Sequence, residues 1–237
     1  MNIQHELIQM ISRVARALGP ELCEKMAFVG GVTTGLLLTD EFVREQVRST
    51  DDVDLIVHVI GTVGFAALQE QLQEKGFRID IPHPDEDLPI CAMKLDGMRV
   101  DFMPDDEAVL SFTNRWYREA LETAMPHVLP DGQPIRLVSP AYFLATKLEA
   151  WKGRGQNDAL GSRDIEDVLI LVDGREELIE EVKAAPAALW DSIAEELTVL
   201  LDDRYFQMAV ESQAQGDGPR RDRLYIRLEQ LAKTRSC

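Results

Sequence analysis

The sequence has no apolar run that could cross a membrane, because no stretch approaches the roughly eighteen consecutive apolar residues that a spanning helix needs. The opening segment, MNIQHELIQMISRVARALGP, carries charges throughout and lacks the apolar centre of a secretory signal peptide. These two absences predict a cytoplasmic protein that has no membrane partner.

Cysteine is scarce, with three residues that are scattered along the chain: Cys23, Cys91 and Cys237. An odd number of widely spaced cysteines excludes a disulfide framework and a zinc framework. We expect reduced thiols, which agrees with a cytosolic protein. Internal repeats and low-complexity tracts are also missing.

Positive charge is in short supply, since 25 Lys and Arg residues face 42 Asp and Glu residues and the formal net charge is −17. This charge balance argues against a protein whose whole surface binds nucleic acid, although it does not exclude a local basic groove. It fits an enzyme for small molecules, a metal-dependent enzyme or a protein with a basic partner.

Hydrophobic periodicity divides the 237 residues into an α/β half and a helical half. Short apolar runs predict strands at 27–31, 53–60, 77–81, 90–95, 98–103 and 135–138, with a hairpin turn at Asp96-Gly97. Helical spacing marks 2–18, 62–75, 114–124 and most of the chain after Ser139. Polar or Pro- and Gly-rich stretches predict loops at 39–50, 83–89 and 125–134. We therefore predict an α/β (α+β) fold, with a mixed sheet and flanking helices in residues 1–137. A helical region, residues 138–237, follows and completes the cleft.

The segment RSTDDVDLIV (48–57) places several carboxylates at the start of an apolar strand. Asp52 and Asp54 are two positions apart, so on a strand they share one face and repel each other unless a cation lies between them. Asp101, in RVDFM, supplies a third acid on a predicted strand. Hard oxygen ligands favour Mg²⁺ or Mn²⁺, so we predict that Asp52, Asp54 and Asp101 form one metal site. The structural alternative is a set of solvated loop acids or helix caps.

The segment FVGGVTTG (28–35) ends a predicted strand with Gly30 and Gly31 and then enters a short helix. Glycines permit positive φ and close backbone approach, and free N–H groups at a helix start favour phosphate. The hydroxyls of Thr33 and Thr34 would add contacts. Neither the GxGxxG nor the Walker spacing is present. The alternative is an ordinary turn between a strand and a helix.

A lysine and two acids mark the helical half. Lys147, in AYFLATKLEAWKG, falls on the inward stripe of its helix, where a charge is costly unless it meets an anion. Asp164 and Asp167, in SRDIEDVLIL, are three residues apart and share one helical face. The alternative is a lysine that reaches solvent and an acid pair favoured by the helix dipole.

In order and spacing, the glycine pair, the TDDVD segment and the later aspartate resemble the nucleotidyltransferase superfamily of the DNA polymerase β type. The resemblance implies a nucleotidyltransferase-type sheet, a triphosphate cradled by Gly30-Gly31, and two Mg²⁺ ions held by the three acids. Many members have Gly-Ser where this chain has Gly30-Gly31, which points to the antibiotic-modifying and AbiEii-like branches.

The later order K-L-x-A and then R-D-[IL]-x-D is similar to motifs of AbiEii-type toxin nucleotidyltransferases. That similarity implies that Lys147 holds the triphosphate and that Asp164 and Asp167 help to complete the nucleotide site.

The resemblance implies transfer of a nucleoside monophosphate (NMP) from a nucleoside triphosphate (NTP), ATP among them, to a hydroxyl group, with Asp101 as the base. By family analogy the acceptor is tRNA and the partner is a cognate antitoxin. The alternatives are a small molecule such as an antibiotic, a protein acceptor, or a non-catalytic interaction protein that keeps the fold.

Overall fold

The computed structural model describes residues 3–80, 91–110, 113–154 and 158–233, so the predicted loop at 83–89 and Cys237 lie outside the described residues. The chain forms two compact units. The first comprises Met1–Thr33 and Arg48–Ser139, and the second comprises Thr34–Val47 and Pro140–Cys237.

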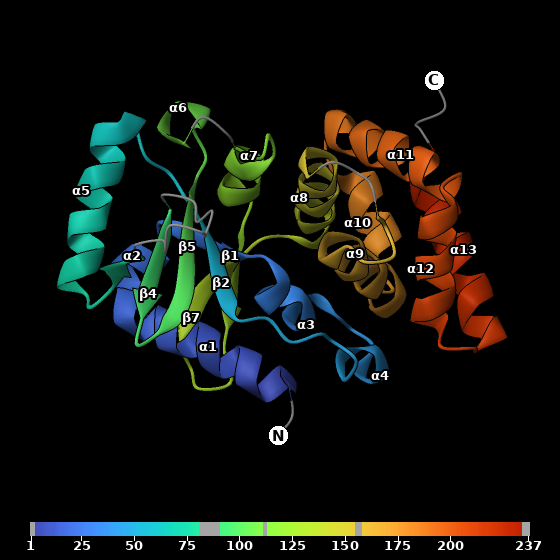
Figure 1. Cartoon of the computed structure of the whole chain (residues 1–237), viewed down its shortest axis with the longest axis horizontal. Helices are drawn as coiled ribbons and strands as arrows, with labels where there is room; N and C mark the ends of the chain where they lie inside the picture. The colour runs from blue at the N-terminus through green and yellow to red at the C-terminus, as the bar shows by residue number, and fades with distance from the viewer. Residues whose placement is uncertain (1–2, 81–90, 111–112, 155–157, 234–237) are drawn as a thin grey trace. The chain divides into compact units, whose positions relative to one another are not determined.

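The first unit contains a mixed sheet, as predicted (Figure 1). In its described part the strand order is β3-β4-β5-β2-β1-β7-β6. β2 pairs with β5 and β1 pairs with β7 in parallel, and the other neighbours are antiparallel. The strands are β1 (Met26–Val29), β2 (Asp52–Val57), β3 (Arg78–Ile79), β4 (Ala92–Leu95), β5 (Met98–Pro104), β6 (Met125–Val128) and β7 (Pro134–Leu137).

The two faces of the sheet differ in chemistry because side chains alternate along each strand. Phe28, Leu55 and Phe102 lie on one face and are wholly buried. Asp54 and Asp101 lie on the other face. The helical elements of this unit are α1 (Ile3–Leu18), α2 (Pro20–Cys23), η1 (Gly31–Thr33), α5 (Gly61–Glu74), α6 (Glu107–Leu110) and α7 (Tyr117–Glu122).

Two local predictions were wrong. Residues 125–128 were read as a loop, yet they form the edge strand β6, where Pro126 is tolerated because an edge position needs no second ladder of hydrogen bonds. Residues 39–50 were also read as a loop, yet they include α4 (Glu41–Arg44). The side chain of Asp40 caps this helix by accepting hydrogen bonds from the N–H groups of Phe42 and Val43.

The second unit is helical, as the sequence pattern predicted for its C-terminal part. It contains α3 (Thr34–Leu37), α4, α8 (Pro140–Gly153), α9 (Arg163–Gly174), α10 (Leu178–Ala184), α11 (Ala187–Leu201), α12 (Arg204–Ala214) and α13 (Gly218–Leu231), drawn from yellow to red in Figure 1 after α4. Within the described ranges, no helix combines the length and apolar character needed to span a bilayer.

Residues 34–47 belong to the second unit because they pack against the end of α9. The N–H groups of Thr39 and Asp40 both donate to the carbonyl of Gly174, at 2.9 Å each. A Cβ atom on Gly174 would lie 2.8 Å from a methyl group of Val43, so the glycine permits the close approach. The sequence pattern predicted one boundary near residue 137, whereas the second unit also includes the earlier segment Thr34–Val47.

A buried ion cluster joins α9 to α13 in the second unit. The Asp173 carboxylate, with 0% of its side chain exposed, accepts from Nε of Arg220 at 2.6 Å and from Nη2 of Arg223 at 3.1 Å. Arg220 has 5% of its side chain exposed and also donates to Gln46 at 2.8 Å. Each buried charge is therefore paired, which is the condition under which burial of a charge is tolerated.

We predict that Arg220→Ala lowers the free energy of unfolding by about 3–5 kcal/mol, because it removes a main partner of a buried carboxylate. The matched control is Arg221→Ala on the same helix, since Arg221 is 42% exposed and pairs with the exposed Asp222. The control should cost far less, because exposed ion pairs contribute little to stability. Urea denaturation of both variants measures the difference, and equal costs would contradict the assigned role of the cluster.

Candidate active site

The three predicted carboxylates come together on one face of the first unit's sheet. β2 and β5 run parallel, and Asp54 lies directly beside Asp101 in the register. Asp52 precedes Asp54 by two residues and shares its face. One carboxylate oxygen from each residue lies within 4.8 Å of the other two. The sequence prediction that these acids gather is therefore confirmed, although their chemical role stays a prediction.

The apolar residues behind the acids fix this arrangement. Leu55, Ile56 and Val57 follow Asp54 on β2 and are fully buried, and Phe102 follows Asp101 on β5 and is also buried. Because this packing sets the register of both strands, the acids cannot slide past each other. Asp101 is 5% exposed, whereas Asp52 and Asp54 are half-buried.

Sequence reasoning missed a cation at this cluster. Arg99 precedes Asp101 by two residues on β5 and lies beside Asp52 in the register. Its Nε donates to Asp101 Oδ1 at 2.8 Å and its Nη2 donates to Asp101 Oδ2 at 2.6 Å. The hydrogen bond to Asp101 raises the pKa of Arg99, and the negative charges of Asp101, Asp52 and Asp54 add to that effect, against the opposing effect of burial. The Arg-x-Asp spacing on a predicted strand was a signal that could have revealed this residue.

A second residue that the sequence reasoning missed is Thr50, which is 9% exposed. Its hydroxyl donates a hydrogen bond to Oδ1 of Asp52. The bond fixes the orientation of that carboxylate just before β2 begins. No general sequence pattern predicts a contact between an Asp-x-Asp segment and the residues before it, so this hydrogen bond is seen only in the structure.

The glycine turn lies against the second acid. Gly30 has φ +80°, and a Cβ atom built on it would lie 1.9 Å from Oδ2 of Asp54. Since real Cβ contacts are far longer, the side chain of Asp54 occupies space that glycine leaves open. Gly30 is thus required by both its backbone conformation and its neighbour.

The predicted helix after the turn is very short. Gly31 begins the single 3₁₀ turn η1, and Thr34 begins the one-turn helix α3. The Thr33 hydroxyl donates to the carbonyl of Gly30 at 2.8 Å, so it supports the turn. Thr34 is fully buried, and among the described residues its hydroxyl has no hydrogen-bond partner. A phosphate contact by Thr34 would therefore require the turn to move.

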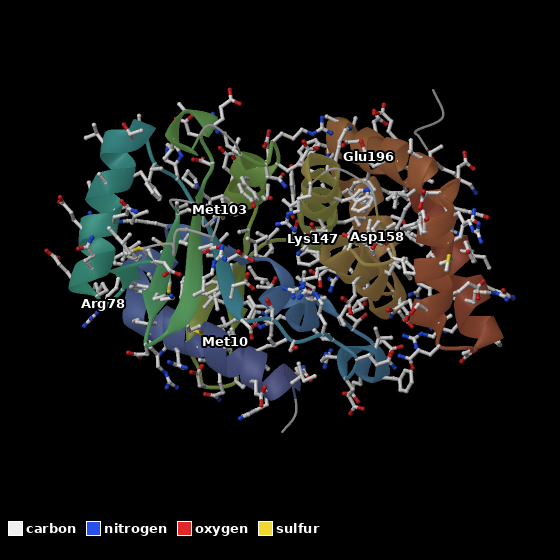
Figure 2. The ribbon with its side chains drawn as sticks, in the orientation of Figure 1. Met10, Arg78, Met103, Lys147, Asp158 and Glu196 are labelled. Atoms are coloured by element: carbon white, nitrogen blue, oxygen red, sulfur yellow. The ribbon has the colours of Figure 1, made fainter. Side chains whose placement is uncertain are left out.

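The second unit holds Lys147, Asp164 and Asp167 together in one buried cluster. Nζ of Lys147, labelled in Figure 2, lies 3.2 Å from Asp164 Oδ1 and 2.7 Å from Asp167 Oδ2. Nη1 of Arg154 lies 2.6 Å from Asp164 Oδ2. The side chains of Lys147, Asp164 and Asp167 are 11%, 4% and 0% exposed. The lysine points inward, as predicted, and the anions that it meets are these two aspartates.

Two described cysteines are free and buried, in agreement with the expectation of reduced thiols. Burial raises the pKa of Cys23 to about 11. Burial also raises the pKa of Cys91 to about 12, and the negative charge of Asp101 adds to the effect. Both thiols are therefore protonated at neutral pH and are poor nucleophiles.

Comparison with known families decides the assignment of the chain. Residues 15–223 match the family described as "Nucleotidyl transferase AbiEii toxin, Type IV TA system". The chain belongs to the AbiEii family of nucleotidyltransferase toxins. No curated protein matches it. One similar solved structure is that of an antigenic nucleotidyltransferase-like protein from Paracoccidioides brasiliensis, with 19% sequence identity, coverage of 98% of this chain and 95% of that chain, and a TM-score of 0.47.

The acid cluster of this AbiEii family member fits a divalent cation on chemical grounds. Its ligands are all carboxylate oxygens, which Mg²⁺ and Mn²⁺ prefer over softer donors. Gly30 also admits the Asp54 carboxylate into the space where any other residue would place a Cβ atom. Both observations concern residues of the first unit alone.

We predict that Gly30→Ala displaces Asp54 and destabilises the protein more than Gly97→Ala does. The two glycines have nearly equal φ angles, +80° and +83°, but a Cβ atom on Gly97 meets nothing within 4 Å. Both variants should pay the strain of a positive φ, about 1–2 kcal/mol, while Gly30→Ala adds the clash. Thermal unfolding of both variants, with titration of Mn²⁺, checks the prediction. Equal stability and unchanged Mn²⁺ affinity would contradict it.

Proposed function

We propose that this chain is a Mg²⁺-dependent nucleotidyltransferase of the EC 2.7.7 type, which transfers NMP from an NTP such as ATP to a hydroxyl acceptor. The observation that carries the proposal is the array of Asp52, Asp54 and Asp101 on one sheet face. Three carboxylates so close together repel one another, so the site favours cations. Membership in a nucleotidyltransferase family supports the same chemistry.

In the proposed reaction, the acceptor oxygen bonds to the α-phosphorus of the NTP while the bond from that phosphorus to the bridging oxygen breaks, and pyrophosphate leaves. The proton of the acceptor hydroxyl passes to Asp101, whose position on β5 beside Asp54 places it within the cluster. Two Mg²⁺ ions, with Mn²⁺ as a substitute, would be held by Asp52, Asp54 and Asp101 and would supply positive charge against the phosphate oxygens.

The nucleotide contacts remain a proposal from the family resemblance. In the first unit, Gly30 and Gly31 would present backbone N–H groups to the triphosphate. Lys147, Asp164 and Asp167, with Thr34, belong to the second unit, and their part in nucleotide binding is proposed from the resemblance alone. The buried ion pairs of Lys147 support a positioned lysine rather than a freely moving one.

We propose tRNA as the acceptor and a cognate antitoxin as the partner, as the toxin–antitoxin family suggests. A local feature of the sheet supports an acceptor that carries phosphates. Arg99, Lys94 and Arg78 are successive cross-strand partners on β5, β4 and β3, so they form a basic row that begins beside Asp52. Directly opposed residues share one face of a sheet, so this row lies on the face of the acids. A neutral small acceptor would gain nothing from such a row.

We predict that Asp52→Asn and Asp54→Asn each lower NMP transfer by at least about a hundredfold, because each removes a charge that the metal and the phosphates require. Asp51→Asn is the matched control, since Asp51 is exposed and is a direct neighbour that lies outside the cluster. The measurement uses NTPs labelled at the α-phosphate, with total tRNA, an aminoglycoside and a protein pool as separate acceptors.

The location of the label identifies the acceptor class. Calorimetric titration with each NTP, with and without Mg²⁺, should show metal-dependent binding that is lost in a combined Asp52→Ala/Asp54→Ala variant. If a well-folded wild-type chain binds no NTP, the transferase proposal fails and an interaction protein that keeps the fold is left.

We predict that Lys147→Met/Asp167→Asn weakens NTP binding at least about tenfold while the second unit stays folded. Removing Lys147 alone would leave two buried carboxylates short of a partner, so its loss of activity could reflect unfolding. The double substitution removes one charge of each sign and leaves the Asp164–Arg154 pair in place. Circular dichroism confirms folding and calorimetry measures NTP affinity. Wild-type affinity in the double variant would show that Lys147 has a structural role alone.

A further inference from the structure

We propose that the guanidinium of Arg99 takes the place of a divalent cation at the carboxylate cluster and must release Asp101 before that residue binds a metal. Arg99 is thus a positioning residue that acts through Asp101. The inference rests on the proposed function, because it assumes that the cluster is a metal site.

Arg99 is one of four charged side chains that form a rectangle on β2 and β5. Asp52 and Asp54 occupy two corners on β2, while Arg99 and Asp101 occupy the matching corners on β5. Neighbouring strands lie about 4.8 Å apart and alternate residues about 6.8 Å apart, so the guanidinium cannot avoid the field of all three carboxylates. The dependence of its raised pKa on all three acids agrees with this placement.

The Asp101 carboxylate is engaged at both oxygens. Each oxygen accepts one hydrogen bond from Arg99, in the two-pronged geometry that makes arginine–carboxylate pairs strong. A metal that approaches Asp101 must therefore share these oxygens with a guanidinium of like charge or displace it.

Burial indicates which partner moves. Asp101 has 7% of its side chain exposed and is anchored between buried strand residues, whereas Arg99 is 32% exposed. Arginine has a long, flexible stem, so it can swing toward solvent without opening the core. The pair therefore breaks by movement of Arg99, which frees its charge for a phosphate oxygen of the substrate.

A different role would predict the opposite effect on metal affinity. If Arg99 were a permanent clamp that orients Asp101 for the metal, its removal would weaken metal binding. If Arg99 competes with the metal, its removal strengthens binding. The direction of the change in metal affinity therefore separates the two roles without any measurement of catalysis.

The test is Mn²⁺ titration of the full chain, with free Mn²⁺ measured by electron paramagnetic resonance. For Arg99→Gln we expect Mn²⁺ to bind about three- to tenfold more tightly than in the wild type, the size expected for loss of one partly exposed charged pair. Arg99→Lys keeps the charge but loses the two-pronged geometry, so its Mn²⁺ affinity should fall between those of the wild type and Arg99→Gln. Without metal, Arg99→Gln should also unfold at a lower temperature, and Mn²⁺ should restore the loss.

The control variant is Lys94→Gln. Lys94 is the direct cross-strand partner of Arg99 and shares its face, but its ammonium lies 2.7 Å from Asp80. Its removal changes the net charge of the face by the same amount. If Lys94→Gln tightens Mn²⁺ binding as much as Arg99→Gln does, the change reflects the overall electrostatic potential of the sheet face and the inference is wrong.

Two further outcomes are distinct from each other. In the first outcome, Mn²⁺ binds the wild type but not Asp101→Asn, and it binds Arg99→Gln no more tightly than the wild type. The inference on Arg99 then fails while the proposed metal site stands. If Mn²⁺ binds neither the wild type nor Arg99→Gln, the metal site and the inference fall together. Binding that appears when Arg99 is removed would give the inference its strongest support.

Discussion

The parallel pairing of β2 with β5 is the constraint on which the candidate site depends. It places Asp54 beside Asp101 and Asp52 beside Arg99, and a slip of one residue would turn one strand's charges toward the apolar face. The buried residues Leu55 and Phe102, which are also register partners, oppose that slip. Core packing thus holds together carboxylates that repel one another. Three acids this close do not stabilise a fold, so their placement side by side points to a ligand of opposite charge.

The cluster around Asp54 and the cluster around Lys147 accommodate close acids differently. In the second unit, two carboxylates meet Lys147 and Arg154, and these four side chains sum to zero charge. In the first unit, three carboxylates lie together, and the described hydrogen bonds of Arg99 go to Asp101 alone among them. A balanced, buried cluster is compatible with a role in structure alone. An unbalanced and partly exposed cluster is the one that a further cation would complete.

Much of this site could be predicted from sequence because strand periodicity is local information. The spacing of Asp52 and Asp54 and the apolar run behind them fix one face, and family motifs indicated the importance of Asp101. The short elements α4 and β6 were missed, because the first depends on a cap from Asp40 and the second on pairing with β7. The contact between Gly30 and Asp54 depends on the pairing of β1 with β2, which no local pattern encodes.

Net charge was the least informative property, because the sheet separates charges that composition adds together. A total of −17 argues against a nucleic-acid surface, yet the register lines up Arg99, Lys94 and Arg78 beside the acids. Screening limits the influence of distant charges to about 8–10 Å at physiological ionic strength, so a phosphate on this face responds mainly to that row, to the acids beside it and to any bound metal. The choice of acceptor therefore rests on a few side chains of one sheet face, where the release of Arg99 from Asp101 would add a free cation at the start of the row.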